Sequence, residues 1–275
     1  MKKKTYAILV IPCFLILLIT LIYPLFTLIF PTFFSDSGFL ANYVVLFKDD
    51  LFRTVLFRTV KIGLIVTTVC ILLGVPSSYY ISRCDKKVRG TLMALSLFPL
   101  LTNSVIRAFA WITILGKNGI INNLLIALGI TSEPISILYS EFSIIIGTIY
   151  LFLPLMITTL IGAMENIEDD YYDASLSLGA NKIVTFINVI LPMSVSGIIV
   201  GSVLVFTGSI TAYTTPFLLG GNRNMVLATY LQQKSTQANG WGDASVIALI
   251  MIVITIIVQM GLQQFAKTMD KRGAH

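Results

Sequence analysis

The chain has 275 residues, of which 56% are hydrophobic and only 12% are charged. Soluble domains carry about 25% charged residues, so this composition excludes an ordinary soluble domain and predicts an all-α, polytopic membrane protein. The net charge of +6 fits Lys and Arg side chains held on the cytoplasmic side of a membrane, and no nucleic-acid partner is expected. The three cysteines have neither metal-site nor redox spacing, so no metal site and no disulfide framework is expected.

The N-terminal part is expected to hold a transmembrane helix. A basic start at Lys2 to Lys4 precedes an apolar run over residues 7–30. This run is longer than the hydrophobic region of a signal peptide, and no small-residue cleavage site follows it, so it predicts a membrane span. Residues 31–58 are polar and aromatic, and a helical stripe over residues 52–59 predicts an interfacial helix on the outer side.

Five further apolar stretches bring the number of predicted transmembrane helices to six. They cover residues 62–81, 91–115, 142–163, 193–213 and 244–264.

The positions of glycine, proline and charged residues predict where the spans are interrupted and where turns and loops connect them. Pro99 and Arg107 are expected to break the third span, and Gly116 to Gly119 predicts a turn. The stretch over 214–243 is predicted as a loop because it contains Pro216 and several glycines. We therefore divide the chain into residues 1–58 (first helix and external stretch), residues 59–265 (a transmembrane domain) and residues 266–275 (a tail).

The distribution of Lys and Arg sets the expected orientation. With the N-terminus inside, eleven basic residues fall on the cytoplasmic side and seven on the outer side. The short loop over 82–90 decides the assignment, because short loops follow the positive-inside rule best. We therefore expect a plasma (inner) membrane protein with both termini and the loop over 164–192 in the cytoplasm. The eleven are Lys2, Lys3, Lys4, Arg83, Lys86, Lys87, Arg89, Lys182, Lys267, Lys271 and Arg272, and the seven are Lys48, Arg53, Arg58, Lys61, Lys117, Arg223 and Lys234.

The loop between the fourth and fifth spans is a polar segment in an apolar chain. Five of the thirteen acidic residues lie at its start, where a helix dipole favours negative charge. Two short helices are predicted, because Gly179 suits a left-handed C-terminal cap and Asn181 can cap a second helix. Pro192 fits the first turn of the next helix. The predicted faces are Tyr171, Ala174, Ser175 and Leu178 in the first helix, and Ile183, Phe186, Ile187 and Ile190 in the second. The module could be a connector that packs on its own spans, or it could present a surface to a partner.

The sequence offers little enzyme chemistry. The only histidine is His275, no G-x-x-x-x-G-K-[ST] phosphate loop occurs, and none of the thirteen acids lies in the middle of a predicted span. A gradient-driven carrier usually keeps ionisable groups inside its spans, so such a carrier is not favoured. We expect neither a catalytic site nor nucleotide hydrolysis in this chain, and its energy source must then be another subunit or an ion gradient.

The polar loop resembles the cytoplasmic "EAA" loop of ABC-importer permeases. That pattern reads Glu-Ala-Ala, three residues, Gly, nine residues, Ile, one residue, Leu-Pro. The chain departs from it by Asp for Glu, Ser for Ala and Val for Ile, and the matching residues are Asp173, Ala174, Ser175, Gly179, Val189, Leu191 and Pro192. The resemblance implies that the first loop helix docks in a groove on an ATPase subunit. The ATPase-coupling residues that follow from the resemblance are Asp173, Ala174, Ser175, Leu178, Gly179, Leu191 and Pro192.

Weaker similarities to the spermidine/putrescine permeases extend over about residues 42–265. They lie at Arg107 to Trp111, at Gly116 to Gly119 and at Thr215 to Gly221. The resemblance implies a type I importer, with two ATPase subunits that bind ATP and Mg, a second permease chain of different sequence, and an external substrate-binding protein. No cofactor is expected in this chain. Polyamines are the expected solute, with another small organic solute or ion of the same family, or a non-transport assembly role, as alternatives.

Six residues are candidates for the substrate path. Aromatic rings can bind an organic cation through cation–π contacts, although each ring could equally be a packing or interfacial residue. The arginine could reach the outer interface, or contact backbone carbonyls or the partner permease. Two acids are more simply explained by a helix start: Asp243 as the N-cap of the sixth helix and Glu141 as a first-turn acid of the fourth. The candidates are Arg107, Trp111, Tyr150, Tyr213, Glu141 and Asp243.

Overall fold

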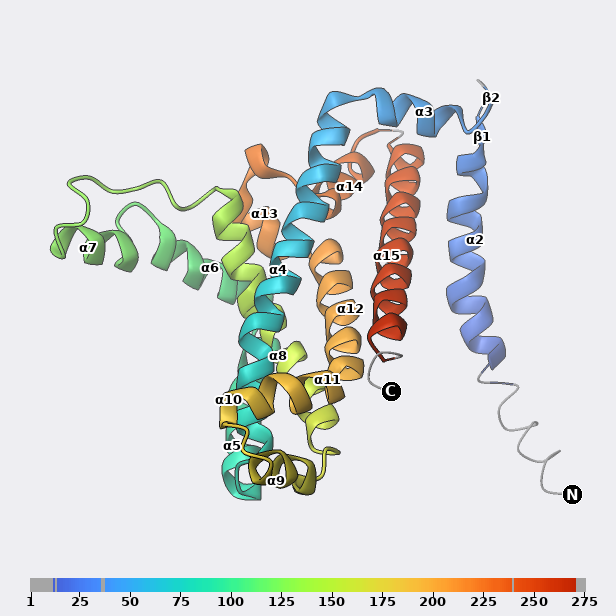
Figure 1. Cartoon of the computed structure of the whole chain (residues 1–275). Coiled ribbons are helices and arrows are strands. Elements are labelled where there is room, and N and C mark those ends of the chain that lie inside the picture. The colour runs from blue at the N-terminus through green and yellow to red at the C-terminus, as the bar shows by residue number, and fades with distance from the viewer. Residues whose placement is uncertain (1–11, 13, 36–37, 239, 271–275) are drawn as a thin grey trace, which may run out of the picture. The chain divides into compact units, whose positions relative to one another are not determined.

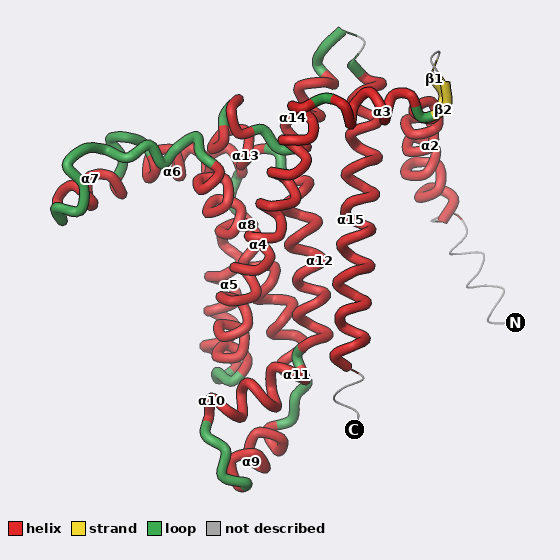
Figure 2. Tube along the Cα trace, turned by 45° about the horizontal axis from the view of Figure 1, so that its top comes forward, coloured by secondary structure: helices red, strands yellow, loops and turns green. Residues whose placement is uncertain are grey.

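A computed structural model of the chain describes residue 12 and residues 14–35, 38–238 and 240–270. Over these residues the protein is built from helices, with one short antiparallel pair of strands, β1 (Phe34–Ser35) and β2 (Gly38–Phe39) (Figures 1 and 2). The helices are η1 (Leu18–Ile22), α2 (Tyr23–Ile29), η2 (Phe30–Phe33), α3 (Ala41–Lys48), α4 (Asp50–Ser82), α5 (Lys86–Leu101), α6 (Ser104–Leu115), α7 (Ile120–Ala127), α8 (Glu141–Met164), α9 (Asp169–Ser177), α10 (Lys182–Thr185), η3 (Phe186–Ile190), α11 (Leu191–Met193), α12 (Val195–Thr211), α13 (Thr214–Gly220), η4 (Asn222–Asn224), α14 (Leu227–Ser235) and α15 (Trp241–Asp270). The all-α prediction is confirmed.

The membrane spans agree with the predicted number. Among the described residues, five helical stretches are long and apolar enough to cross a bilayer, and a sixth crosses if a pair bent by 68° forms one span. The bent pair is Lys182–Met193 with Val195–Thr211, so the second helix of the polar loop leads directly into the fifth predicted span. The five are Phe14–Phe33, Asp50–Ser82, Ser104–Ala127, Glu141–Met164 and Trp241–Gln264.

The chain forms two compact units, one of residues 1–54 with 230–252 and one of residues 55–229 with 253–275. In the first unit, Tyr230 packs on the buried ring of Phe52 and donates a hydrogen bond to Asp49 Oδ2 at 3.3 Å. Lys234 lies over the Tyr230 ring and pairs with Asp243 at 3.2 Å. Burial is the largest single influence on Lys234 and lowers its pKa, but the hydrogen bond to Asp243 and the interactions with Tyr230 and the Asp243 charge together outweigh it, so the pKa of Lys234 is raised.

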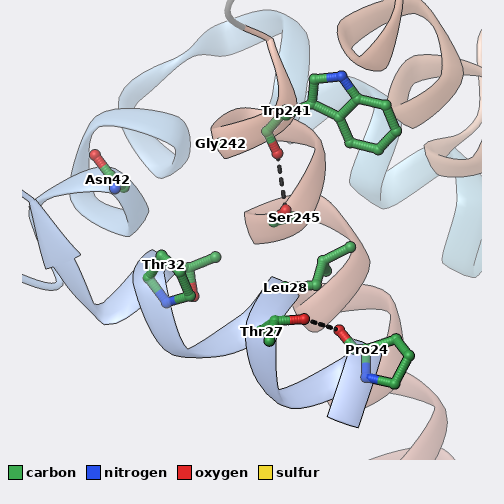
Figure 3. A pocket seen from close by; sticks show the side chains of 9 residues that line it. Pro24, Thr27, Leu28, Thr32, Asn42, Trp241, Gly242 and Ser245 are labelled. Carbon is green, nitrogen blue, oxygen red and sulfur yellow. Dashed lines mark hydrogen bonds between the residues drawn. The ribbon is translucent and has the colours of Figure 1, made fainter. Parts of the chain in front are cut away.

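Figure 3 shows an open cavity of about 530 Å³ in the first unit. Its hydroxyls are already bonded to carbonyls of their own helices, Thr27 to Pro24 at 3.0 Å and Ser245 to Trp241 at 2.8 Å. The cavity therefore offers few free polar groups to a ligand.

Two predictions in this part of the chain are wrong. Residues 52–59 do not form a separate interfacial helix, because α4 runs without a break from Asp50 to Ser82. Asp243 is not an N-cap, because α15 begins at Trp241 and places Asp243 in its first turn. A carboxylate is still favourable there, since it faces the positive end of the helix dipole.

The core of the second unit is the packing of α8 against α12, with α5 and α13 also contacting α8. Glycines on α12 allow the close approach. A Cβ at Gly197 would lie 2.4 Å from Ala163 Cβ, and one at Gly208 would lie 2.3 Å from a ring atom of Phe152. Helix α4 joins this core through Ser78, which is fully buried and donates to the Ile157 carbonyl at 3.1 Å. Small residues at helix crossings are the usual means of close packing inside a membrane.

The third predicted span, residues 91–115, is divided between two helices, but neither Pro99 nor Arg107 lies at the break, because Pro99 is inside α5 and Arg107 is inside α6. The stretch that is long and apolar enough to cross is Ser104–Ala127, which corrects the predicted bounds. The chain breaks between α5 and α6 at Thr102 and Asn103, and Asn103 caps α6 by accepting from the backbone N–H groups of Val105 and Ile106. Helices α6 and α7 then turn away to one side of the second unit (Figures 1 and 2). The turn predicted at Gly116 to Gly119 separates them, so that prediction is confirmed.

The stretch over 214–243 is not a simple loop, which corrects the sequence prediction. It contains α13, η4 and α14. Helix α13 is held by Ser143 Oγ and Tyr139 N–H, which both donate to the Leu219 carbonyl, at 2.8 and 2.9 Å. The chain leaves α13 at Gly221, whose φ of +60° a residue with a side chain rarely adopts.

Candidate functional site

The first part of the polar loop forms a capped helix, as predicted. Helix α9 carries Asp169 and Asp170 in its first turn. Gly179 has a φ of +91°, and its N–H donates to the Leu176 carbonyl at 2.9 Å. The N–H of Ala180 donates to the Ser175 carbonyl at 3.2 Å. These bonds satisfy carbonyls at the end of α9, so the predicted left-handed cap at Gly179 is confirmed.

The second part of the loop also begins as predicted. Asn181 Oδ1 accepts from the Val184 N–H at 2.9 Å and caps α10. The helix widens into the π-turn η3 and continues through α11, which has Pro192 in its first turn. Ser175 and Thr185 hydroxyls lie 2.9 Å apart and tie the two short helices together.

The apolar side chains of the loop do not all face the spans. Ile190 is fully buried, whereas Leu178 is 89% exposed and Ile183 is 70% exposed. The two predicted helix faces are therefore only partly internal packing surfaces. We define the loop surface as the exposed residues Tyr171, Asp173, Ala174, Leu178, Gly179, Ile183 and Ile187. Of the other predicted coupling residues, Ser175 and Leu191 are half-buried and Pro192 is exposed.

The base of the loop is held by contacts that the sequence reading missed. Arg89 pairs with Glu165 at 2.5 Å, and Arg83 pairs with Asp169. Arg83 lies in the turn after α4 and Arg89 lies in the first turn of α5, and both are about 80 residues from their partners in sequence. No local pattern signals a pair at that separation, although the basic turn and the acidic loop were both evident.

Three of the six predicted path residues lie together in the second unit. Arg107, Trp111 and Tyr150 line a cavity of about 490 Å³, with Phe98, Thr102 and Ile106. The Trp111 and Tyr150 rings meet edge to face with centroids 5.7 Å apart. The lining is largely apolar and aromatic, which is typical of pockets that bind small organic molecules.

Arg107 makes backbone contacts, which was one of its two predicted roles. The residue is buried, and one guanidinium nitrogen donates to the Pro99 carbonyl at 2.6 Å and to the Thr102 carbonyl at 3.3 Å. Those carbonyls end α5, where the helix dipole favours a positive charge. Arg107 therefore bridges the break between α5 and α6.

The other predicted path residues lie elsewhere. Tyr213 stacks on Phe217 at 5.2 Å and is not among the residues lining the cavity. Glu141 is in the first turn of α8, as predicted, and pairs with Lys61 at 2.5 Å and Arg58 at 3.0 Å. Arg58 also donates to the Met225 carbonyl at 3.1 Å, so this cluster ties the N-terminal parts of α4 and α8 to the chain before α14. Among the described residues, no group of three His, Cys, Asp or Glu side chains could hold a metal ion.

Comparison with known proteins finds similar sequences over most of the chain. The family model described as "Binding-protein-dependent transport system inner membrane component" matches residues 70–271. The chain is 33% identical over 226 residues to the spermidine/putrescine transport system permease protein PotB of Haemophilus influenzae, which covers 82% of this chain and 79% of that protein. It is 29% identical over 211 residues to the molybdenum transport system permease protein ModB of Mycobacterium bovis, with coverage of 76% and 78%.

A solved structure agrees with the fold. A chain of a bacterial alginate ABC transporter, solved in complex with an alginate pentasaccharide-bound periplasmic protein, superposes with a TM-score of 0.77. The match covers 98% of this chain and 96% of that one at 19% identity, so it concerns the fold alone. The family match and the identity to PotB confirm the resemblance first drawn from the polar loop. The chain is a multi-pass membrane protein and belongs to the binding-protein-dependent transport system inner membrane component family, the permease subunits of ABC importers.

Proposed function

We propose that this permease forms half of the translocation path of an ATP-driven importer for polyamines. The identity of 33% to a spermidine/putrescine permease over 82% of the chain is the observation that carries the proposal. In the complete importer, two copies of an ATPase subunit bind ATP and Mg and supply the energy. A second permease of different sequence completes the path, and an external binding protein delivers the solute. Residues 59–265 form the transmembrane domain of this scheme, preceded by residues 1–58 and followed by a tail over 266–275.

The loop surface is proposed as the docking site of the ATPase subunit. Leu178, at the C-terminal cap of α9, is 89% exposed, and Ile183, on α10, is 70% exposed. Full burial of such a side chain is worth about 1.5–3 kcal/mol, so a groove that covers both would gain appreciable free energy. Asp173, Ala174 and Gly179 lie on the same surface, and Ser175 ties α9 to α10 through Thr185. We include Leu191 and Pro192, in α11, as the end of this coupling segment.

The docking proposal requires the loop and both termini to be cytoplasmic. In a variant without the native cysteines, a thiol from Ser177→Cys should be protected from a membrane-impermeant maleimide added to intact cells. A thiol from Ser132→Cys, in the exposed loop between α7 and α8, should be modified. Both should react in inverted or permeabilised membranes. Labelling of Ser177→Cys from outside would refute the orientation.

The aromatic rings of the cavity can contact an organic cation, but only weakly, because the Arg107 guanidinium lines the same cavity and repels it. Dehydrating an ammonium group is costly unless acids or aromatic faces replace its water. The described acidic residues lie at helix ends or in loops, whereas Trp111 and Tyr150 present rings to the cavity. We propose Trp111 and Tyr150 as part of the path, with Arg107, Tyr213, Glu141 and Asp243 contributing to its walls or ends. High affinity then belongs to the external binding protein.

The solute is tested by ATP hydrolysis in the complex reconstituted with its ATPase subunit and binding protein. Spermidine and putrescine are expected to stimulate hydrolysis, and molybdate and an uncharged solute of similar length are expected not to. In the same system Trp111→Ala should slow polyamine uptake without changing solute affinity of the isolated binding protein. Phe109→Ala is the matched control, because Phe109 is exposed on the same helix and does not line the cavity. Stimulation by molybdate alone would favour the molybdate alternative that the ModB similarity suggests. Stimulation by the neutral solute alone would also remove the polyamine assignment, and both results would leave the importer assignment standing.

A further inference from the structure

We propose that the turn between α4 and α5 is a second mechanical attachment of the loop surface, and that Arg83 and Arg89 are the positioning residues that make it. The peptide chain itself joins the loop to α8 and α12. The two arginines would join it to α4 and α5 as well, so that movement of a docked ATPase subunit reaches four helices. This inference rests on the proposed docking function.

Arg89 fixes the entry to the loop. It pairs with Glu165, the residue that follows α8, at 2.5 Å, and the two side chains are only 25% and 39% exposed. A second guanidinium nitrogen donates to the Cys84 carbonyl at 3.2 Å, within the turn that ends α4. A partly buried pair with a further backbone bond has fixed geometry, and it is less screened than an exposed surface pair.

Arg83 fixes the start of the docking helix. It pairs with Asp169 in the first turn of α9, and it donates to the Ile167 carbonyl at 3.4 Å. Its guanidinium also lies over the Tyr79 ring, 5.8 Å from the centroid. Asp169 thus meets both a cation and the positive end of the α9 dipole. In both views the turn between α4 and α5 lies beside α9 (Figures 1 and 2).

Helix α4 also contacts the chain as it leaves the loop. The Tyr79 ring packs on Phe186 in η3, with centroids 5.0 Å apart. One end of α4 therefore touches the segment before α9 and the segment after it. Two attachment points on either side of a helix resist its rotation as well as its translation.

Closely packed apolar side chains also join α4 to α8 and α5 near this attachment. Ile81 of α4 forms a buried cluster with Ile157 and Ile161 of α8, and Leu92 and Met93 of α5 pack against it. Close-packed side chains transmit displacement because they have no free volume to absorb it. A load on α9 would then reach α4 and α5 directly, without passing along the rest of the loop to α8 or α12.

A charge exchange tests the inference in the reconstituted complex with ATPase subunit and binding protein. Arg89→Glu and Glu165→Arg should each retain the ATPase subunit in a pull-down, because neither residue belongs to the loop surface. Each should lower uptake about tenfold and weaken the stimulation of ATP hydrolysis by the loaded binding protein. Interaction energies between paired side chains correspond to rate changes of roughly this size. The double variant, with the charges exchanged, should recover both uptake and stimulation. Lys87→Glu is the matched control, because Lys87 is exposed on the same turn and forms no ion pair among the described residues.

The outcomes separate this inference from the docking proposal. If the unaltered permease does not retain the ATPase subunit, the docking proposal fails. If it does, and Arg89→Glu transports normally or the charge exchange gives no recovery, the attachment has no role in coupling. If a charge-reversal variant fails to accumulate in the membrane, Glu165→Gln is used in its place, because it removes the charge without reversing it. This variant should bind the ATPase subunit normally and show the same loss of stimulated ATP hydrolysis.

Discussion

Replacing Gly179 by valine is expected to abolish ATP-driven uptake while leaving the permease in the membrane. Gly179 has a φ of +91°, and an added Cβ would meet nothing within 4 Å, so backbone strain is the cause and crowding is not. A β-branched residue in this region is a true outlier, at a cost of roughly 1–2 kcal/mol or more. The strain is relieved if the chain after α9 turns another way, which separates Leu178 from Ile183 and divides the loop surface. Uptake should fall at least about tenfold, because a rise of about 1.4 kcal/mol in the activation free energy of transport is enough for a tenfold change in rate.

A second substitution at the same position tests whether backbone strain causes the loss of uptake. Asparagine tolerates positive φ better than other residues with side chains, so Gly179→Asn should keep much of the uptake that Gly179→Val loses. The measurements are solute uptake in vesicles and retention of the ATPase subunit in a pull-down, with permease content quantified in both. Normal uptake by Gly179→Val would show that the loop conformation is not needed for coupling. Equal loss in both variants would assign the effect to the added side chain instead of to φ.

The loop was predictable from sequence because its signals are local. Gly179 and Asn181 act on backbone groups within four residues, so their roles follow from short-range geometry. The spans were predictable because bilayer thickness sets their length and apolar character. The family resemblance came from the same loop, and the comparisons confirm it over residues 70–271. The docking role of the individual loop residues stays a prediction.

What escaped prediction depends on contacts between distant residues. Helices α13 and α14 were missed because Pro216 and the glycines around it suggested a loop, whereas contacts such as Ser143 to Leu219 hold α13 as a helix. The turn arginines pair with acids about 80 residues away, and nothing in the local sequence selects those partners. Tyr213 was grouped with Trp111 and Tyr150 by residue type alone, but packing places it on Phe217. Residue chemistry suggests what a side chain could do, and only the fold decides what it meets.

The largest loss of stability is expected from a substitution where α8 packs against α12. Gly197→Val should sharply reduce the amount of folded permease and lower its thermal unfolding midpoint in detergent. A Cβ at Gly197 would lie 2.4 Å from Ala163 Cβ, an atom that no side-chain rotation can move. The helices must separate, which also disturbs the fully buried side chains of Met156 and Leu160 nearby.

Overpacking of this kind typically costs about 1–3 kcal/mol, and the two added methyl groups place the expected cost at the upper end. Gly162→Val is the matched control, because Gly162 precedes Ala163 on α8 but an added Cβ would meet nothing within 4 Å. Both variants lose one helical glycine to the same residue, so propensity and hydrophobicity are equal and only the close approach differs. Membrane content measured by immunoblot and the midpoint measured by fluorescence should fall for Gly197→Val and stay near the unaltered values for Gly162→Val. Equal behaviour of the two variants would mean that α12 can move away from α8 at little cost, and that the close approach at Gly197 does not determine the stability of the fold.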